Sequence, residues 1–300
     1  MKKIKKIKIA VVGFGNIGKA VCDTLTVTED MELCGIVRRT AAEGETCNGI
    51  KVAGDIKKLG GVDVAILCGP SRKVPEMAEK YLQMGINTVD SFDIHGDIWD
   101  LKVRLDGIAK ANKACSIIST GMDPGADSII RALFLALTPK GITYTNFGPG
   151  MSMGHTVAVK AVAGVKAAMS MTIPAGAGTH NRMVYVEIEP GSDFSAIAEK
   201  IKNDPYFIND NTKVILVDNV NDLLDVGHAS NIVRKGGSGM TCNQLLEFTM
   251  KINNPALTSQ MLVSCARASM RQPPGCYTVI ELPPINLLSG GDEQAIRALV

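Results

Sequence analysis

The chain has 300 residues, of which 46% are hydrophobic and 21% are charged, and its formal net charge at pH 7 is +2. A chain of this length and composition is long enough for about two hydrophobic cores and is not expected to be disordered. The charge is too balanced for a nucleic-acid-binding surface. No apolar run approaches the ~20 residues of a membrane span, so neither nucleic acid nor a membrane is expected as a partner.

Eight cysteines occur without a C-x-x-C pair and without a Cys/His cluster at metal-ligand spacing. Most of them lie in apolar or helix-like segments. A reduced, cytoplasmic protein with buried thiols explains this usage better than a disulfide framework does. No metal site is expected.

The first apolar stretch, residues 7–12, leads directly into Gly13, Gly15 and Gly18, which have the G-x-G-x-x-G spacing, and a helix-like segment follows. This order is typical of the first βαβ unit of a dinucleotide-binding domain. One glycine allows the tight turn, one lets the backbone approach a pyrophosphate, and one lets the helix pack closely on the strand. The alternative is a tight turn without ligand. The coenzyme contacts expected here are Gly13, Gly15, Asn16, Ile17 and Gly18.

The predicted second strand, Met31 to Val37, ends in Arg38 and Arg39. Arg38 lies 20 positions after Gly18, where an NAD-selective unit places an acidic residue against the ribose 2′-hydroxyl. Guanidinium groups suit a 2′-phosphate instead because they bind phosphate oxygens bidentately. The pair therefore predicts NADP, although a solvated basic pair at a strand end is the alternative.

Strands and helices continue to alternate to about residue 120, which predicts a Rossmann-type doubly wound parallel sheet over residues 1–120. Strands are expected at 62–68, 87–90 and 115–119, with helices at 75–85 and 99–114; the strand at 115–119 reads as the last of this domain. Ligands bind at the carboxyl edge of such sheets. The second set of expected coenzyme contacts, at the end of the 62–68 strand, is therefore Cys68, Pro70, Ser71 and Arg72.

From residue 121 the pattern changes to longer strands that alternate in polarity. This favours an α+β substrate-binding and oligomerisation domain over residues 121–254, with a mixed or antiparallel sheet. Its strands are expected at 142–147, 168–173, 183–189, 213–220, 232–234 and 245–252, and its helices at 157–168 and 194–202. A final helix begins at Asn254-Pro255, and the segment 255–300 is expected to pack back on the first domain.

Asp93 and Asp123 follow two successive predicted strands of the first domain. Carboxylates at neighbouring strand ends can hold an ammonium group and accept its proton. Each is equally well explained as a turn-forming residue. Similarly, the Gly- and Met-rich stretch 148–155 either presents backbone N–H groups to an anion or is a connector. Arg182, His180 and His228 are candidate carboxylate partners, with a structural or exposed role as the alternative.

Taken together, these segments resemble the meso-diaminopimelate dehydrogenase family, and the resemblance runs essentially end to end. It is carried by residues 11–18, 37–39, 89–97, 123–125, 143–155, 170–174, 252–258 and 274–277. The string at 143–155, TYTNFGPGMSMGH, is the most specific of these. The length of 300 resembles the shorter branch of the family, which tolerates a broader range of D-amino acids.

The resemblance implies reversible NADP-dependent oxidative deamination of meso-2,6-diaminopimelate at its D-centre, in diaminopimelate and lysine biosynthesis. It places Asp93 and Asp123, the expected catalytic residues, against the D-centre ammonium. It places the Met153-Gly154 backbone against the neighbouring carboxylate and Phe147 in the pocket wall. The distal L-centre is expected to be held by Thr172, Arg182, His228 and Asn254. Family members are homo-oligomers, at least dimers.

One residue departs from the family pattern. Where the family commonly has Gly-Trp-Asp-Pro-Gly, this chain has Met122 before Asp123. Methionine is flexible and lacks the indole N–H donor, so a looser wall and greater tolerance for other D-amino acids are expected. The alternative functions are another NADP-dependent imine or amino-acid reductase and a non-catalytic NADP-binding sensor.

Overall fold

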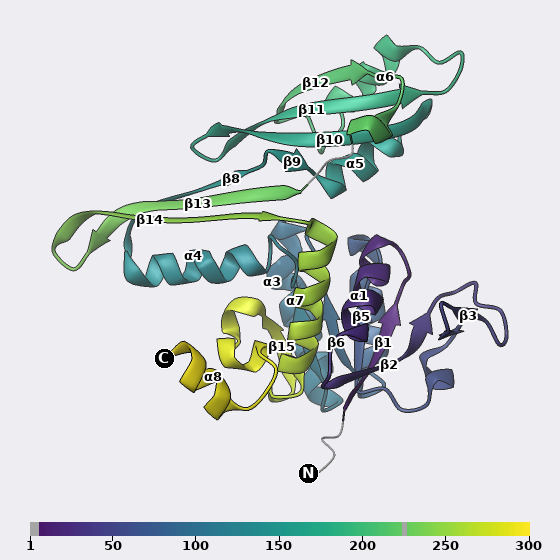
Figure 1. Cartoon of the computed structure of the whole chain (residues 1–300), viewed down its shortest axis with the longest axis vertical. Helices are drawn as coiled ribbons and strands as arrows, with labels where there is room; N and C mark the ends of the chain where they lie inside the picture. Colours follow the sequence, from purple (N-terminus) through teal and green to yellow (C-terminus); the bar gives the residue numbers. More distant parts are fainter. Residues whose placement is uncertain (1–5, 224–226) are drawn as a thin grey trace. The chain divides into compact units, whose positions relative to one another are not determined.

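The computed structural model describes residues 6–223 and 227–300. The chain divides into two compact units (Figure 1). Unit 1 comprises Met1–Ala132 and Pro255–Val300, and unit 2 comprises Leu133–Asn254. Among the helices of the described residues, none combines the length and the hydropathy that a membrane crossing requires.

Unit 1 is built on one eight-stranded sheet in the order β15-β7-β6-β5-β1-β2-β4-β3. The pairs from β15 to β4 are parallel, and only the β3–β4 pair is antiparallel. The strands are β1 (Ile7–Val12), β2 (Met31–Val37), β3 (Thr46–Cys47), β4 (Ile50–Ala53), β5 (Val64–Leu67), β6 (Asn87–Asp90), β7 (Cys115–Ile118) and β15 (Gly275–Thr278). The strand order reverses between β1 and β5, where doubly wound sheets bind their ligands.

Helices cover both faces of this sheet, because its strands are apolar on both sides. Ile9 and Val11 of β1 belong to one core cluster, and Ala10 and Val12 belong to the other, as the two-residue period of a strand requires. The helices of unit 1 are α1 (Asn16–Thr26), α2 (Val74–Leu82), α3 (Ile98–Ala111), α7 (Asn254–Ser269) and α8 (Asp292–Leu299). The predicted Rossmann-type fold is confirmed.

The C-terminal segment contributes an edge strand that the sequence did not indicate. β15 pairs in parallel with β7, so the prediction that residues 115–119 form the last strand of this sheet is wrong. Only four residues pair, and prolines precede them, so their local pattern carries no strand signal. Two backbone contacts fix the position of β15: Gly275 N–H donates to the carbonyl of Ala114, and Cys276 N–H donates to the Asp106 carboxylate.

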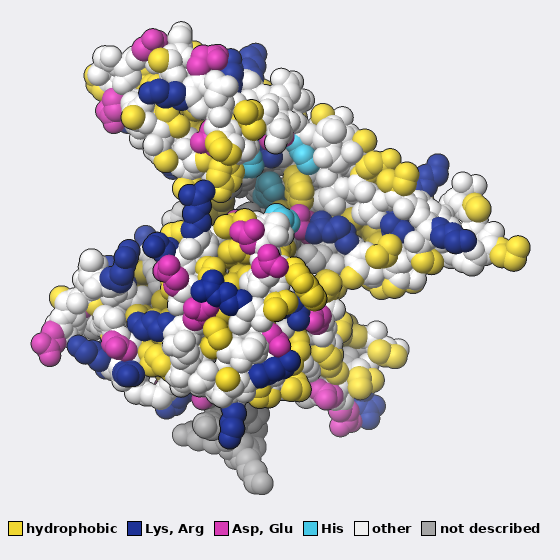
Figure 2. All heavy atoms as spheres, turned by 180° about the vertical axis from the view of Figure 1, so that it is seen from behind, with side chains coloured by type: hydrophobic (Ala, Val, Ile, Leu, Met, Phe, Trp, Pro, Cys, Tyr) yellow, Lys and Arg dark blue, Asp and Glu magenta, His cyan; other side chains and the backbone are white. Residues whose placement is uncertain are grey.

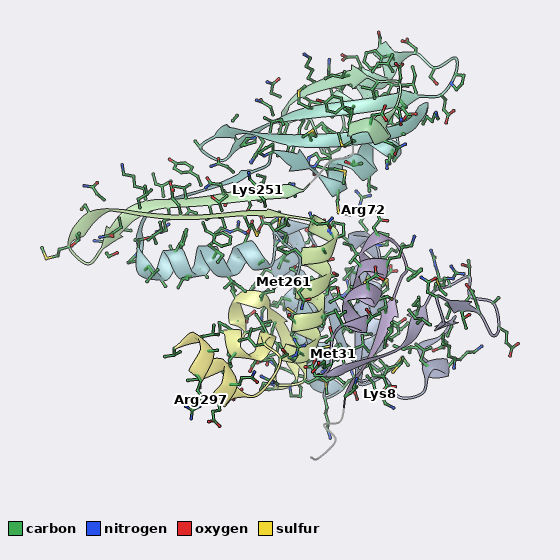
Figure 3. The ribbon with its side chains drawn as sticks, in the orientation of Figure 1. Lys8, Met31, Arg72, Lys251, Met261 and Arg297 are labelled. Atoms are coloured by element: carbon green, nitrogen blue, oxygen red, sulfur yellow. The ribbon has the colours of Figure 1, made fainter. Side chains whose placement is uncertain are left out.

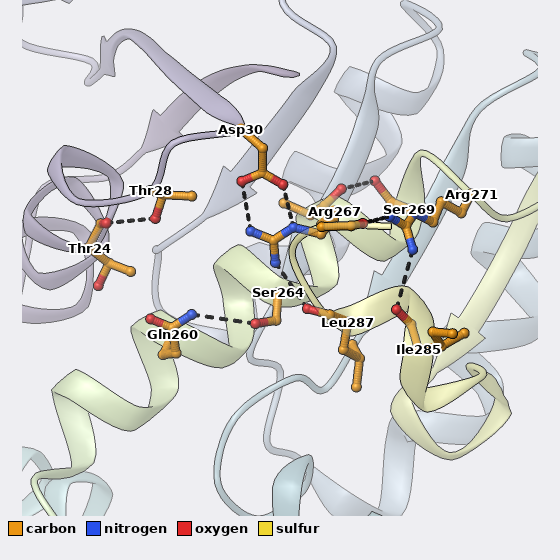
Figure 4. A network of polar contacts seen from close by, with 12 residues as sticks. Thr24, Thr28, Asp30, Gln260, Ser264, Arg267, Ser269, Arg271, Ile285 and Leu287 are labelled. Carbon is orange, nitrogen blue, oxygen red and sulfur yellow. Dashed lines mark hydrogen bonds and ion pairs between the residues drawn. The ribbon is translucent and has the colours of Figure 1, made fainter. Parts of the chain in front are cut away.

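A buried arginine joins this C-terminal segment to the rest of unit 1 (Figure 4). Arg267 of α7, whose side chain is only 6% exposed, donates from Nε and Nη2 to the two carboxylate oxygens of Asp30, at 2.5 and 2.9 Å. Its Nη1 donates to the carbonyl oxygen of Leu287. The bidentate pair lowers the pKa of Asp30, chiefly through the hydrogen bond.

Unit 2 contains two sheets. A four-stranded mixed sheet has the order β12-β11-β10-β9, and a three-stranded antiparallel sheet has the order β14-β13-β8. The strands are β8 (Lys140–Phe147), β9 (Gly150–Met151), β10 (Val165–Gly176), β11 (Thr179–Ile188), β12 (Asn211–Leu216), β13 (His228–Ser238) and β14 (Thr241–Ile252). The helices are α5 (Met153–Lys160) and α6 (Phe194–Lys202), and α4 (Ala126–Leu137) begins in unit 1 and ends here. The predicted α+β class is confirmed.

The helix expected at 157–168 is misplaced. α5 ends at Lys160, and Val165 already begins β10. Gly164, with φ +93°, turns the chain between them, and its carbonyl oxygen accepts a hydrogen bond from the N–H of Glu189, which follows β11. The alanines and valines of 157–168 fit a helix or a buried strand equally well, so tertiary pairing decides between the two.

We expect Asp30→Asn to destabilise the protein by about 1–3 kcal/mol at pH 7, because it leaves the buried Arg267 without its charged partner. Since the pKa of Asp30 is lowered on folding, this contribution is present well above pH 3.8 and is lost as the pH falls below that value. Urea unfolding at pH 7 and pH 3 measures both effects. Glu293→Gln, in an exposed pair with Arg297, is the control and should cost at most about 0.5 kcal/mol. Equal losses of unfolding free energy in the two variants would contradict the prediction.

Candidate functional site

The glycine turn after β1 is shaped by close backbone contacts. A Cβ at Gly13, where φ is +96°, would lie 2.8 Å from the carbonyl oxygen of Cys68, and a Cβ at Gly18 would lie 2.2 Å from the carbonyl oxygen of Gly13. These two glycines are therefore required by the packing of α1 on β1 and β5. A Cβ at Gly15 would meet nothing within 4 Å. The space at Gly15 is open, as the approach of a pyrophosphate requires, so the turn fits a dinucleotide.

α1 begins directly at this turn, with Gly15 as its N-cap. The first helical N–H groups, from Asn16 to Gly18, have no partner within the helix. The first turn contains no acidic residue, and Gly15 and Asn16 are exposed. The helix N-terminus thus offers donors and a positive dipole end to an anion at the turn.

The two arginines after β2 differ in their surroundings. Arg38 forms an ion pair with Glu45, and Glu45 also accepts a hydrogen bond from the N–H of Ala42. Arg39 is exposed next to it. A 2′-phosphate at this strand end would meet Arg39 directly and would compete with Glu45 for Arg38.

The segment after β5 lies at the same sheet edge. Cys68 packs beside the glycine turn, burial raises the pKa of its thiol, and Pro70 leads into a short 3₁₀ turn, Ser71–Lys73. Figure 3 places Arg72 at this edge of unit 1, opposite the amino ends of β1 and β2 that Lys8 and Met31 mark. The expected coenzyme contacts therefore lie at the carboxyl edge of the sheet, in the segments that follow β1, β2 and β5 and in the first turn of α1.

Both predicted carboxylates also lie in loops at this edge. Ser71 Oγ donates to Asp93 Oδ1 at 2.6 Å, so the loops after β5 and β6 touch. Asp123 follows β7, its side chain is only 10% exposed, and it forms an ion pair with Arg131 of α4. Met122 beside it is buried. The exposed Asp93 and the sheltered Asp123 thus have different partners.

A third carboxylate, Asp90, was not predicted and connects these two loops. It ends β6 and is fully buried. Its Oδ1 accepts from the N–H of Phe92, in the loop that carries Asp93, and from the N–H of Ser119, in the loop that carries Asp123. Ser119 has a left-handed φ of +59°, an unfavourable conformation that such anchoring can maintain. The available signal was an Asp directly after Val89 at the end of a strand inside the predicted sheet, because Asp is rarely buried.

In unit 2, Thr172 and Arg182 face each other across the β10–β11 pair. Arg182 Nη1 donates to Thr172 Oγ1, and its Nε donates to Asp210 Oδ2 at 2.6 Å. The Arg182 side chain is 12% exposed, so this cation is held in place and sheltered from water. Thr172 is buried.

An aromatic and histidine cluster belongs to the same unit. The Phe147 ring stacks on His228 with 6.2 Å between ring centroids, and it lies 5.5 Å from the ring of His180. His180 Nε2 accepts from the N–H of Phe147. Burial, and then the positive charge of Arg182, lowers the pKa of His180; burial likewise lowers the pKa of His228. Both histidines are therefore neutral near pH 7, which leaves Arg182 as the cation of this cluster.

His228 has a buried polar atom that needs a partner. The residue is only 7% exposed, and its Nδ1 has no hydrogen-bond partner within residues 6–223 and 227–300. Buried polar atoms in proteins are nearly always paired, so this nitrogen is expected to meet a ligand or a water. Thr172, Arg182, His228 and Phe147, which the sequence proposed for the substrate, thus lie in one unit.

The Gly- and Met-rich stretch is not a plain connector. Gly150 and Met151 form β9, and Met153 begins α5, with Ser152 as its N-cap. The N–H groups of Met153 and Gly154 are therefore in the first helical turn, where they have no partner within the helix. Asn254, the last expected substrate contact, is the first residue of α7.

Comparisons with known proteins give a consistent result. A family model described as diaminopimelic acid dehydrogenase C-terminal domain matches residues 121–254, and one described as oxidoreductase family, NAD-binding Rossmann fold, matches residues 7–89. The meso-diaminopimelate D-dehydrogenase of Bacteroides fragilis is 58% identical over 99% of this chain and 100% of its own length.

Two solved structures match this chain over 99% of its length and 100% of their own length. The diaminopimelate dehydrogenase of C. glutamicum in complex with diaminopimelate is 29% identical, with a TM-score of 0.89. An engineered D-amino acid dehydrogenase bound to NADP⁺ is 27% identical, with a TM-score of 0.86.

We expect Asp90 to make the free energy of unfolding depend on pH. Burial raises the pKa of Asp90 to about 6, while its two hydrogen bonds oppose the rise. The buried carboxyl group therefore lowers stability as the pH rises from about 3.8, where the unfolded chain ionises, to about 6, where the folded protein does. Asp90→Asn keeps an oxygen acceptor and removes this ionisation. Relative to the parent, its unfolding free energy should gain on the order of 3 kcal/mol between pH 4 and pH 7.

Urea unfolding at several pH values measures this difference. Asp55→Asn, which removes a partly exposed carboxylate at the start of a short 3₁₀ turn in the same unit, is the control for the loss of one acidic group. If the free energies of unfolding of Asp90→Asn and the parent differ by the same amount at every pH, the prediction is contradicted.

Proposed function

Because the chain belongs to the meso-diaminopimelate D-dehydrogenase family, we propose that it catalyses the reversible NADP-dependent oxidative deamination of meso-2,6-diaminopimelate at its D-centre. The products are L-2-amino-6-oxopimelate and ammonia, and the reaction serves diaminopimelate and lysine biosynthesis. The observation that carries this proposal is the 58% identity to the Bacteroides fragilis enzyme over essentially the whole of both chains. A sensor without turnover or a reductase for a smaller imine would not need the sheltered Arg182 cluster of unit 2.

NADP, when bound at the glycine turn, accepts the hydride that leaves the D-carbon. The protein's part is to bind and orient the substrate and to move a proton. Asp93 and Asp123 hold the D-centre ammonium, and one of the two accepts its proton. The resulting substrate imine is hydrolysed by water, which releases ammonia.

The remaining contacts fix the substrate. The Met153 and Gly154 N–H groups bind the carboxylate next to the D-centre, and Phe147 forms part of the wall. Thr172, Arg182, His228 and Asn254 bind the distal L-centre. A clamp on the L-centre allows only a D-configured carbon to present its hydrogen for transfer, which accounts for the stereochemical choice.

We also propose that the protein self-associates and forms at least a dimer. Large apolar side chains are exposed along one arm of unit 2, formed by the end of α4 and by β8, β13 and β14 (Figure 2). They include Leu133, Leu135, Leu137, Ile142 and Leu245. Exposed apolar side chains such as these, on α4 and on the strands, favour an interface with a second copy. The eight cysteines are free thiols, which supports a reducing, cytoplasmic location.

The reaction is tested by the absorbance of NADPH on addition of meso-diaminopimelate, with NADP and NAD compared by kcat/KM. A clear preference for NADP is expected. Asp93→Asn and Asp123→Asn should each lower kcat by about 10²- to 10⁴-fold, because they remove a proton acceptor and a partner of the ammonium. The Kd for NADP should not change. Asp97→Asn, an exposed acid close to Asp93, is the control. Near-normal kcat in both variants would remove these carboxylates from proton transfer.

Met122 is proposed to widen the range of substrates. In Met122→Trp the wall becomes more rigid and gains an N–H donor, so activity on D-alanine, which has no distal centre to be clamped, should fall by about tenfold relative to activity on meso-diaminopimelate. The ratio of the two kcat/KM values measures this. Met122→Leu, which keeps the volume, separates the effect of the indole from the loss of the sulfur. An unchanged ratio in Met122→Trp would count against the role of Met122.

A further inference from the structure

The guanidinium of Arg182 is held by a residue that neither the sequence motifs nor the family resemblance singles out. Asp210 lies one residue before β12, and β12 pairs in parallel with β11, which carries Arg182. Its Oδ2 accepts from Arg182 Nε at 2.6 Å. The sequence separation of 28 residues means that only the β11–β12 pairing brings the two charges together.

Some N–H donors of the Arg182 guanidinium are bonded within the protein, and others remain for a ligand. A guanidinium has five N–H donors in a rigid plane. Asp210 accepts a hydrogen bond from Nε, and Thr172 accepts one from Nη1. One donor of Nη2 is parallel to Nε–H and points to the side of Asp210, whereas the other Nη2 donor and the second donor of Nη1 point away from it. Because the plane is rigid, fixing Nε also fixes the direction in which these donors point.

Among the described residues, the second basic side chain near Asp210 is a histidine. His155 Nε2 lies 4.0 Å from the same Oδ2, while His155 Nδ1 is bonded to Ser152 Oγ at 2.8 Å. Burial lowers the pKa of His155 to about 4, and the nearby charge of Arg182 contributes. The imidazole is therefore neutral at physiological pH and packs edge-on against the rings of Tyr206 and Phe207. The charge of Asp210 thus acts on Arg182.

We propose that Asp210 is a specificity-determining positioning residue, which fixes Arg182 through Nε so that the other guanidinium donors meet the distal carboxylate of the substrate. This inference rests on the proposed function, in which Arg182 binds that carboxylate. Without Asp210 the long arginine side chain is free to adopt other rotamers, and ordering it on substrate binding costs affinity. Asp210 acts at the end of the substrate remote from the reacting carbon, so its loss affects substrate binding more than chemistry.

The test uses the full-length enzyme and steady-state kinetics at saturating NADP. Asp210→Asn is expected to raise KM for meso-diaminopimelate by about tenfold, with kcat changed less than about threefold and KM for NADP unchanged. Asp210→Glu, which restores the charge, should recover part of the affinity. The control is Asp193→Asn, which alters an exposed carboxylate at the N-cap of α6 in the same unit and should leave KM unchanged.

A double-mutant cycle with Arg182→Met shows whether Asp210 acts through Arg182. If it does, Asp210→Asn adds little to the KM of the Arg182→Met enzyme, so the two effects are not additive. A general loss of structure would instead change kcat and KM for NADP as well. Thermal unfolding of each variant identifies any such loss.

Three results overturn the inference, and they can be told apart. If Arg182→Met raises KM while Asp210→Asn leaves it unchanged, or if the two effects are additive, Asp210 does not position Arg182. If Arg182→Met itself leaves KM for meso-diaminopimelate unchanged, the distal subsite of the proposed function is wrong, and the role of Asp210 fails with it.

Discussion

The parallel strands β1, β5, β6 and β7 run in the same direction, so the loops that follow them all emerge at one edge of the unit 1 sheet. The glycine turn, the Cys68–Arg72 segment, and the loops of Asp93 and Asp123 are these four loops. Their contacts depend on the alignment of the strands: Gly13 lies against the backbone of Cys68, and Ser71 bonds to Asp93. The candidate coenzyme contacts after β1 and β5 and the two candidate catalytic carboxylates therefore depend on one constraint, the parallel alignment of these strands.

Two further carboxylates organise the polar groups around them. Asp90 receives N–H groups from the loops of Asp93 and Asp123, and Asp210 fixes the orientation of Arg182. Each is linked to residues distant in the chain, and their surroundings differ. Asp90 is fully buried, and its carboxylate accepts from backbone N–H groups of the described residues, whereas Asp210 is partly exposed and bonds to a charged group. Burial explains the raised pKa of Asp90.

Unit 2 builds its cluster by antiparallel register. Thr172 lies opposite Arg182, and Ser230 of β13, two residues after His228, lies opposite Phe147 of β8. Shifting either pair by one residue would turn these side chains to the other face of the sheet. The neutral histidines and the sheltered guanidinium give the cluster a positive character that suits a carboxylate. The buried His228 Nδ1, without a partner among the described residues, is expected to meet a ligand atom or a water.

The sequence by itself determined the Rossmann-type fold, because the glycine spacing and the alternation of apolar strands with helices are local patterns set by backbone geometry. It also indicated the family, which the comparisons confirm, through long strings such as 143–155. The edge strand β15, the boundary between α5 and β10, and the roles of Asp90 and Asp210 were decided only by the tertiary structure. Each of these depends on pairing or hydrogen bonding between segments far apart in the chain, and a local pattern of residues carries no information about such contacts until the chain has folded.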